Sequence, residues 1–179
     1  MTKEEKTMKS ERVYEGKVIN LRVDTVELPD RKYSKREIVE HAGAVAIVAV
    51  NPEGKLLLIK QFRKPVEEVL LEIPAGRIEP NENPEHTALR ELEEETGFKA
   101  NKIEKLVQYY STPGFSNEIL HIYLAQELEA GIAKPDEDEY IETFPMTLEE
   151  AMDKIKAGEI KDSKAIIGIL MYYRYHVLK

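Results

Sequence analysis

The sequence predicts an α+β domain in which separate helices flank a mixed sheet, and two observations favour this fold class. Short segments rich in β-branched residues, each ending at turn residues, follow one another in the first half of the chain. Segments with helix-capping residues then alternate with further strands in the second half. Because 179 residues can bury a sizeable apolar core, we expect one globular domain.

The strands are predicted from composition and turns. Residues 43–50, GAVAIVAV, form a continuous run of small and β-branched side chains, which is typical of a buried central strand. The turn at residues 51–54 (NPEG) follows, so residues 55–62 are expected to pair back as a hairpin. The other expected strands cover residues 11–17, 18–28, 35–41, 69–73, 105–110, 119–125 and 140–144.

Three helices are predicted from their ends and their periodicity. The clearest one begins at Pro84, with Asn83 as the N-cap and Gly97 as the C-terminal stop. Two further helices are expected over residues 147–157 and 163–178.

The composition excludes several classes of protein. Hydrophobic residues make up 42% and charged residues 34% of the chain, which favours neither a disordered nor a membrane protein. The absence of cysteine excludes disulfides, zinc–cysteine sites and thiol nucleophiles. A net charge of −8 argues against nucleic acid as a partner, although a few arginines or carboxylate-bound cations can still hold a small phosphate ligand. The first ten residues, MTKEEKTMKS, lack the apolar core of a secretory signal, so we expect a cytoplasmic protein with no membrane partner.

Three glutamates on the clearest helix indicate a divalent cation. Glu91, Glu94 and Glu95 are spaced i, i+3 and i+4, which places them on one arc of about 100°. Their like charges repel one another and oppose the helix macrodipole near its C-terminal end. A hard cation such as Mg²⁺ would remove both conflicts. An acidic cluster of this kind is, by itself, more typical of a solvated helix face. The residues around the cluster therefore decide between a metal site and a solvated face.

The residues around this cluster match a known motif. Gly76 enters a loop that contains Glu82, and we expect Arg90 to pair with Glu82 and so fix the loop to the helix. The segment resembles the Nudix box, G-x5-E-x7-REU-x-EE-x-GU, where U is bulky and apolar. The matching residues are Gly76, Glu82, Arg90, Glu91, Leu92, Glu94, Glu95, Gly97 and Phe98. The resemblance implies the Nudix α-β-α sandwich with a mixed sheet, in which the box forms a loop–helix–loop, preceded by N-terminal antiparallel strands.

Four other segments resemble the ADP-ribose pyrophosphatase branch of that family, within a similarity from about Tyr14 to Leu178. They are residues 34–41 (SKREIVEH), 61–65 (QFRKP), 111–118 (STPGFSNE) and 136–139 (DEDE). The resemblance implies Mg²⁺-dependent hydrolysis of the pyrophosphate bond of ADP-ribose to AMP and ribose 5-phosphate, with Mn²⁺ as a substitute. The alternatives are another nucleoside diphosphate derivative as substrate (a sugar nucleotide or a dinucleotide), or a Nudix domain that binds nucleotide without catalysis.

The same resemblance implies a metal site and a catalytic base. The predicted metal ligands are the Ala75 carbonyl, Glu91, Glu94, Glu95 and Glu139, and Glu94 is also a predicted catalytic residue. Glu137 corresponds to the catalytic base of the branch. From composition alone, the acidic segment that contains Glu137 and Glu139 is more typical of a solvated turn.

Substrate contacts are expected on three further segments. Arg63 ends a strand and is suited to clamp phosphate through two hydrogen bonds, the alternative being a surface arginine of an edge strand. Arg36 and Glu37 lie on an early strand that in this family packs across a dimer, the alternative being an exposed ion pair. Gly114 permits close approach of the backbone to a ligand, and Glu118 resembles a nucleoside-contacting residue.

The resemblance also divides the chain. Residues 1–10 are expected to be a flexible tail, residues 11–42 to be N-terminal strands for dimerisation and substrate contact, and residues 43–179 to be the Nudix hydrolase domain. The expected assembly is a homodimer that acts on a small nucleoside diphosphate sugar.

Overall fold

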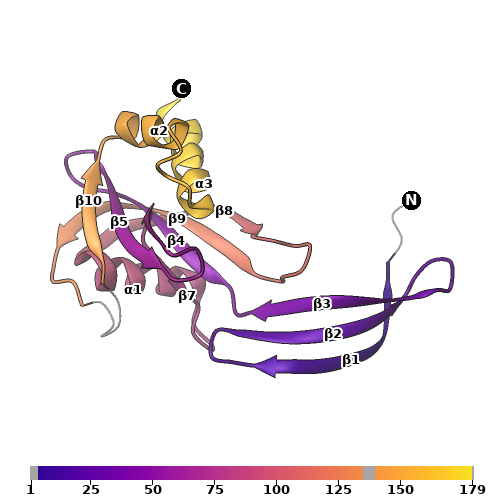
Figure 1. The fold of residues 1–179 in the computed structure, drawn as a ribbon. Coiled ribbons are helices and arrows are strands. Elements are labelled where there is room, and N and C mark those ends of the chain that lie inside the picture. The colour runs from indigo at the N-terminus through magenta and orange to yellow at the C-terminus, as the bar shows by residue number, and fades with distance from the viewer. Residues whose placement is uncertain (1–3, 135–139, 179) are drawn as a thin grey trace. The chain divides into compact units, whose positions relative to one another are not determined.

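The computed structural model describes residues 4–134 and 140–178 (Figure 1). The predicted base Glu137 and the predicted metal ligand Glu139 lie outside this described part of the chain. The chain forms two compact units: residues 1–43 together with 109–119, and residues 44–108 together with 120–179. Within the described ranges, none of the helices has the length and apolar character required to cross a bilayer.

The first unit is a three-stranded antiparallel sheet. Its strands are β1 (Lys6–Glu15), β2 (Ile19–Glu27) and β3 (Tyr33–His41), in the order β1-β2-β3. All side chains of β1 are exposed, so β1 is held mainly by its backbone pairing with β2. β1 begins inside residues 1–10, the range predicted to be a flexible tail. The polar residues of this range give no strand signal in the sequence, but their backbone pairs with β2. In addition, the Ser10 hydroxyl donates a hydrogen bond of 2.6 Å to Asp24 of β2.

The loop of residues 109–119 extends the first unit along β3. The Val39 amide donates to the Phe115 carbonyl at 2.8 Å, and the Asn117 amide donates back to the Val39 carbonyl at 3.2 Å. The Asn117 side chain also accepts a hydrogen bond of 2.9 Å from the His41 amide. The two segments that resemble the ADP-ribose pyrophosphatase branch in this unit, residues 34–41 and 111–118, therefore lie side by side.

The second unit is built on a mixed sheet with the main order β10-β5-β4-β9-β8. β4 runs parallel to β9 and antiparallel to β5, while the short strands β6 and β7 pair with β5 and β4. β4 lies in the centre, and all its residues after Ala44 are buried, which confirms the central strand predicted from its composition. The strand bounds are β4 Ala44–Val50, β5 Leu56–Arg63, β6 Glu68–Glu72, β7 Ala75–Arg77, β8 Phe98–Tyr110, β9 Ile119–Ala130 and β10 Glu142–Met146.

Helices cover both faces of this sheet, α1 (Pro84–Thr96) on one face and α2 (Leu148–Lys156) and α3 (Ser163–Tyr172) on the other (Figure 1). Alternate side chains of β4 point to opposite faces. Ile47 packs in one apolar cluster with Leu92 of α1, whereas the Cγ2 methyl group of Val48 lies against Gly168 of α3. This arrangement is the α-β-α sandwich expected from the resemblance.

Two local features differ from the expectation. β7 forms where Gly76 was expected to enter a loop, because Gly76 pairs with Val45 of β4 even though proline and glycine at residues 74–76 disfavour strands. The last helix was expected to continue to Leu178, but its α-helical part ends at Tyr172 and a π-helical turn, η1 (Tyr173–Val177), follows.

The capping residues of α1 act as expected. The Asn83 side chain accepts a hydrogen bond from the Glu85 amide, and Gly97 adopts the left-handed conformation with φ of 76°. The left-handed conformation disfavours any side chain at Gly97. A side chain there would also overlap a neighbour, because its Cβ would lie 2.6 Å from the backbone nitrogen of Ala133. Gly97 therefore ends the helix and also permits the close approach of residues 131–133.

We predict that Gly97→Ala lowers the free energy of unfolding by more than Gly158→Ala. Gly158 has nearly the same φ, 73°, but a Cβ at that position would have no heavy atom within 4 Å, so Gly158→Ala reports only the cost of left-handed backbone, about 1–2 kcal/mol. Gly97→Ala adds the overlap with Ala133. Urea denaturation measures both values, and equal losses of stability would contradict this account.

Candidate functional site

One guanidinium joins the predicted metal-binding helix to the loop before it. Arg90 donates from Nε and Nη2 to the two carboxylate oxygens of Glu82, at 3.0 and 3.1 Å. This pairing confirms the contact expected from the sequence. Nη1 of Arg90 donates to Glu91 and to Glu94, at 2.8 Å each. A single cation thus stabilises three carboxylates, two of which are predicted metal ligands.

The contact between Arg90 and Glu82 shifts the pKa values of both groups. Hydrogen bonding to Arg90 lowers the pKa of the Glu82 carboxyl to about 2 from its ordinary value of 4.5. The same hydrogen bonds raise the pKa of the Arg90 guanidinium above its already high ordinary value. Both groups therefore remain charged throughout the neutral range of pH.

Glu95 links α1 to β7. Its side chain is buried, with 3% of the residue exposed, and its Oε2 atom accepts a hydrogen bond of 2.9 Å from the Ala75 amide. The structure therefore brings Glu95 next to Ala75, whose carbonyl is another predicted metal ligand.

Gly76 provides the space that Glu91 occupies. A Cβ atom at position 76 would lie 1.8 Å from the Cδ atom of Glu91 and 1.9 Å from its Oε1 atom. Any side chain at this position would displace the carboxylate. The need for glycine at the first position of the motif is therefore steric. Glu91 and Glu95 therefore meet residues 75–76 where β7 packs against α1, and Glu94 is joined to Glu91 through Arg90.

The donor set at this junction is of the kind that hard divalent cations prefer, namely carboxylate oxygens and a backbone carbonyl. No three acidic or histidine side chains within the described ranges are spaced so that they could hold a metal ion directly. Glu91 and Glu94 bond to Arg90, and Glu95 bonds to the Ala75 amide. The residues present fit a hard cation by their chemistry, and these hydrogen bonds hold the carboxylates on one side of the helix.

Arg63, the predicted phosphate clamp, lies in a cluster of ionised side chains in the same unit. Its Nε and Nη2 atoms donate to the two oxygens of Glu72 at 2.8 and 2.7 Å. Lys164 of α3 also donates to Glu72. Burial raises the pKa of the Glu72 carboxyl, but the contacts with Arg63 and Lys164 outweigh burial and hold this pKa below its ordinary value. Glu72 therefore remains ionised although its side chain is only 1% exposed.

Sequence reasoning missed Glu72 and Lys164. The available signal was a glutamate within the apolar segment of residues 69–73, because a charged side chain that becomes buried with such a segment requires a partner. Lys164 comes from a helix more than ninety residues later, and nothing in the sequence indicates that contact.

The other predicted substrate residues lie in the first unit. A pocket of about 350 Å³ there is lined by Arg36, Glu37 and Gly114, together with Glu5, Ile38, Pro113, Phe115, Ser116 and Asn117. Arg36 donates two hydrogen bonds to Glu5, at 2.9 and 2.6 Å, so its ion-pair partner is Glu5 and not its neighbour Glu37. Glu118 accepts a hydrogen bond from Ser111 and lies 3.4 Å from Nδ1 of His41.

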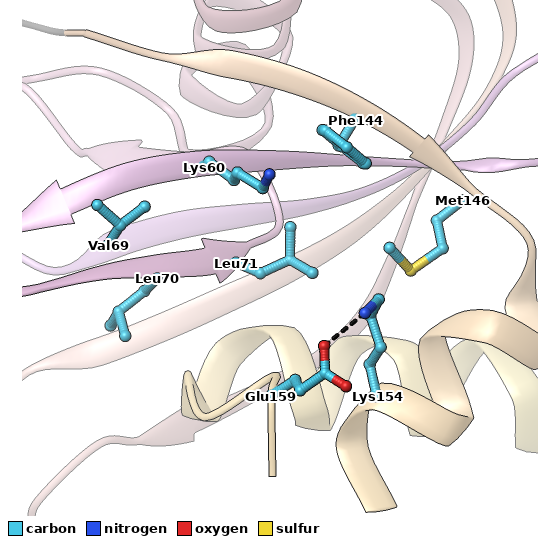
Figure 2. Close-up of a pocket in the computed structure, with 8 residues that line it drawn as sticks. All are labelled: Lys60, Val69, Leu70, Leu71, Phe144, Met146, Lys154 and Glu159. Carbon is cyan, nitrogen blue, oxygen red and sulfur yellow. Dashed lines mark hydrogen bonds and ion pairs between the residues drawn. The ribbon is translucent and has the colours of Figure 1, made fainter. Parts of the chain in front are cut away.

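A further hollow of about 340 Å³ in the second unit contains none of the predicted site residues (Figure 2). It lies among β5, β6, β10 and α2. Lys60 lies 4.1 Å from the centre of the Phe144 ring, and Lys154 forms an ion pair with Glu159. Its remaining walls are apolar and are formed by Val69, Leu70, Leu71 and Met146.

Comparison with known proteins gives two family matches. The NUDIX domain matches residues 40–166, and a domain described as the nucleoside diphosphate sugar hydrolase N-terminal domain matches residues 5–39. An ADP-ribose pyrophosphatase of Bacillus subtilis (strain 168) is 52% identical over 168 residues, which cover 93% of this chain and 91% of that protein.

Two other similarities extend over nearly the whole chain. A methanol dehydrogenase activator of Bacillus methanolicus is 46% identical and covers 98% of this chain and 96% of its own length. The crystal structure of an ADP compounds hydrolase matches with a TM-score of 0.87 at 22% identity, covering 98% of this chain and 95% of that one, which shows a shared fold.

The Glu82–Arg90 pair predicts a specific loss of stability in acid. Because the pKa of Glu82 is lowered to about 2 in the folded chain, its contribution to stability is complete above about pH 4.5 and is lost as the pH falls towards 2. Glu82→Gln is expected to lower stability at pH 7 and to make stability less dependent on pH in that range.

Urea denaturation between pH 7 and pH 3 measures this difference. Glu53→Gln is the matched control, because the Glu53 side chain is 71% exposed and its nearest cation, Lys55, is 3.5 Å away. If Glu82→Gln and Glu53→Gln have the same pH profile as the unmodified chain, Glu82 does not contribute in the way described.

Proposed function

This chain belongs to the Nudix hydrolase family, and from that premise we propose that it hydrolyses the pyrophosphate bond of ADP-ribose to AMP and ribose 5-phosphate. The single observation that carries the proposal is the placement of Glu91 and Glu95 against residues 75–76, with Glu94 joined to Glu91 through Arg90, in the loop–helix arrangement of the complete motif. The name of the Bacillus subtilis relative supports ADP-ribose as the substrate.

Members of this family use a divalent cation, and we propose Mg²⁺ for this chain, with Mn²⁺ as a substitute. The proposed ligands are Glu91, Glu94, Glu95 and the Ala75 carbonyl, joined by Glu139 from outside the described residues. A bound cation supplies charge neutralisation for the diphosphate and for the oxygens that gain negative charge during the reaction.

The residues of the chain have separate tasks in this mechanism. Arg90 holds Glu91 and Glu94 in place and fixes the loop through Glu82. Glu95 keeps its orientation through the Ala75 amide. Glu137, with Glu94 as the second catalytic residue, accepts the proton of the attacking water. The water oxygen bonds to one phosphorus, the bridging P–O bond breaks, and the two monophosphates leave.

We propose that the first unit recognises the nucleoside part of the substrate. Arg36, Glu37 and Gly114 share one pocket, and Glu118 is held nearby within the same unit by Ser111.

We also propose a cytoplasmic homodimer in which residues 11–42 contact the second copy. Exposed apolar side chains on these strands, such as Val13, Tyr14 and Tyr33, support such an interface. Size-exclusion chromatography with light scattering tests the assembly.

Two alternatives remain within the family. The description of the N-terminal domain match supports a nucleoside diphosphate sugar as an alternative substrate. A nucleotide-binding domain without catalysis is less well supported, because all carboxylates of the motif are retained.

We predict that the purified chain releases AMP from ADP-ribose in the presence of Mg²⁺. The assay compares ADP-ribose with NADH, GDP-mannose and ADP-glucose, with Mg²⁺, with Mn²⁺ and with a chelator, and identifies the products. Preference for another diphosphate would support the alternative substrate, and the absence of cleavage of any of them with either metal would reject the hydrolase proposal.

Glu95→Gln is expected to lower kcat by a factor of at least about 100 while the fold is retained, because glutamine keeps the shape and the hydrogen bond to Ala75 but removes the charge. Glu93→Gln is the matched control. Glu93 lies on the same helix, pairs with Lys99 on the surface and is not a proposed ligand. Steady-state kinetics and thermal unfolding measure both variants, and unchanged kcat in folded Glu95→Gln would contradict the metal assignment.

A further inference from the structure

We propose that Glu72 is a positioning residue that orients the Arg63 guanidinium towards the diphosphate, and that Lys164 of α3 holds Glu72 in place. This inference rests on the proposed function and extends it to residues outside the motif. Arg63, Glu72 and Lys164 come from β5, β6 and α3, so three separate elements of the second unit meet at one carboxylate.

The register of β5 and β6 explains how Arg63 reaches Glu72. Arg63 is paired with Glu68, whereas Glu72 is paired with Ile59. Ile59 and Arg63 are an even number of positions apart on β5, so their side chains point to the same face of the sheet. Glu72 is the cross-strand partner of Ile59, so Glu72 also lies on that face. The Arg63 side chain therefore runs back along the strands before its guanidinium meets the carboxylate.

The hydrogen bonds to Glu72 fix the plane of the guanidinium. Glu72 accepts from Nε and from Nη2, at 2.8 and 2.7 Å, which is the side-on bidentate geometry. Two parallel hydrogen bonds prevent rotation about the last bond of the side chain. Arg63 is consequently held in one orientation before any ligand binds, and less conformational entropy is lost on binding.

This geometry leaves the far end of Arg63 available. A guanidinium has five N–H donors, and within the described part of the chain only Nε and Nη2 of Arg63 donate to a partner. The three remaining donors are on Nη1 and Nη2 and form the end-on fork that matches two oxygens of a phosphate. The Arg63 side chain is 36% exposed, so a ligand can contact it.

Lys164 secures Glu72 from α3, and Asp162 holds Lys164. Lys164 donates to Glu72 and, at 2.9 Å, to Asp162. Asp162 is the N-cap of α3, and its other oxygen accepts from the Ala165 amide at 2.9 Å. Because Glu72 and Lys164 have only 1% and 11% of their side chains exposed, neither can readily leave the cluster. The start of α3 thus supports the orientation of Arg63.

Glu72, which holds Arg63, lies shortly before Ala75 in the chain, and the Ala75 amide donates to the proposed metal ligand Glu95. The hydrogen bonds that Arg63 donates to Glu72 raise the pKa of Arg63, and the charge of Glu95 contributes to the same shift. An oriented guanidinium near Glu95 is suited to contact a phosphate that a bound cation also contacts.

The test is a double-mutant cycle on kcat/KM for ADP-ribose with saturating Mg²⁺. We expect Arg63→Ala to lower kcat/KM about 100-fold and Glu72→Gln about 10-fold. The double variant should be no worse than Arg63→Ala, because Glu72 acts only through Arg63. Glu68→Gln is the matched control: Glu68 is on the same strand and pairs with Lys161 on the surface, and its kcat/KM should stay within about twofold.

Chemical rescue gives a readout that a purely structural role would not affect. Guanidinium ion at millimolar concentration should restore part of the activity of Arg63→Ala, because Glu72 can hold the free ion where the side chain was. The same addition should not rescue the double variant, which lacks the carboxylate. Equal rescue of the two variants would overturn the inference.

The remaining outcomes also decide between the hypotheses. Losses in Arg63→Ala and Glu72→Gln that multiply in the double variant, or unchanged kcat/KM in folded Glu72→Gln, would overturn the positioning role. If Glu72→Gln does not fold, Glu72→Asp replaces it, because the shorter side chain keeps the charge but cannot reach both Nε and Nη2; wild-type kinetics in Glu72→Asp would then overturn the inference. If the unmodified chain cleaves no diphosphate, the proposed function itself fails.

Discussion

The geometry of the candidate site depends on the guanidinium of Arg90. Three carboxylates approach one another along a helix end where the macrodipole disfavours negative charge, and Arg90 contacts two of them while it fixes Glu82 in the preceding loop. Without a cation at this position, Glu91 and Glu94 would repel each other and turn towards solvent. Arg90 therefore does more than link the loop to the helix, since it also fixes the positions of two proposed metal ligands, Glu91 and Glu94.

The parts of the fold that were predicted from the sequence are those that depend on neighbouring residues. The N-cap at Asn83, the stop at Gly97 and the buried strand at Ala44–Val50 each have a local chemical cause. The parts that were missed depend on distant partners. β7 exists because β4 supplies a strand to pair with, and β1 starts at Lys6 because β2 lies beside it.

The same distinction applies to the candidate site. The Arg90–Glu82 contact was predicted because the motif fixes their spacing along the chain, and the structure confirms it. The partners of Arg36 and Arg63 are Glu5 and Glu72, which strand pairing brings into reach and which no motif spacing indicates. The roles of Glu137 and Glu139 remain predictions from the resemblance.

The close approach of Gly76 and Glu91 has a consequence for anyone who wishes to redesign this site. The volume that a methyl group at position 76 requires is already filled by the carboxylate at position 91. The residues at positions 76 and 91 must therefore be changed together. A library that varies position 76 alone will contain only variants with a displaced Glu91 carboxylate. New ligand geometries become accessible when both codons are randomised together.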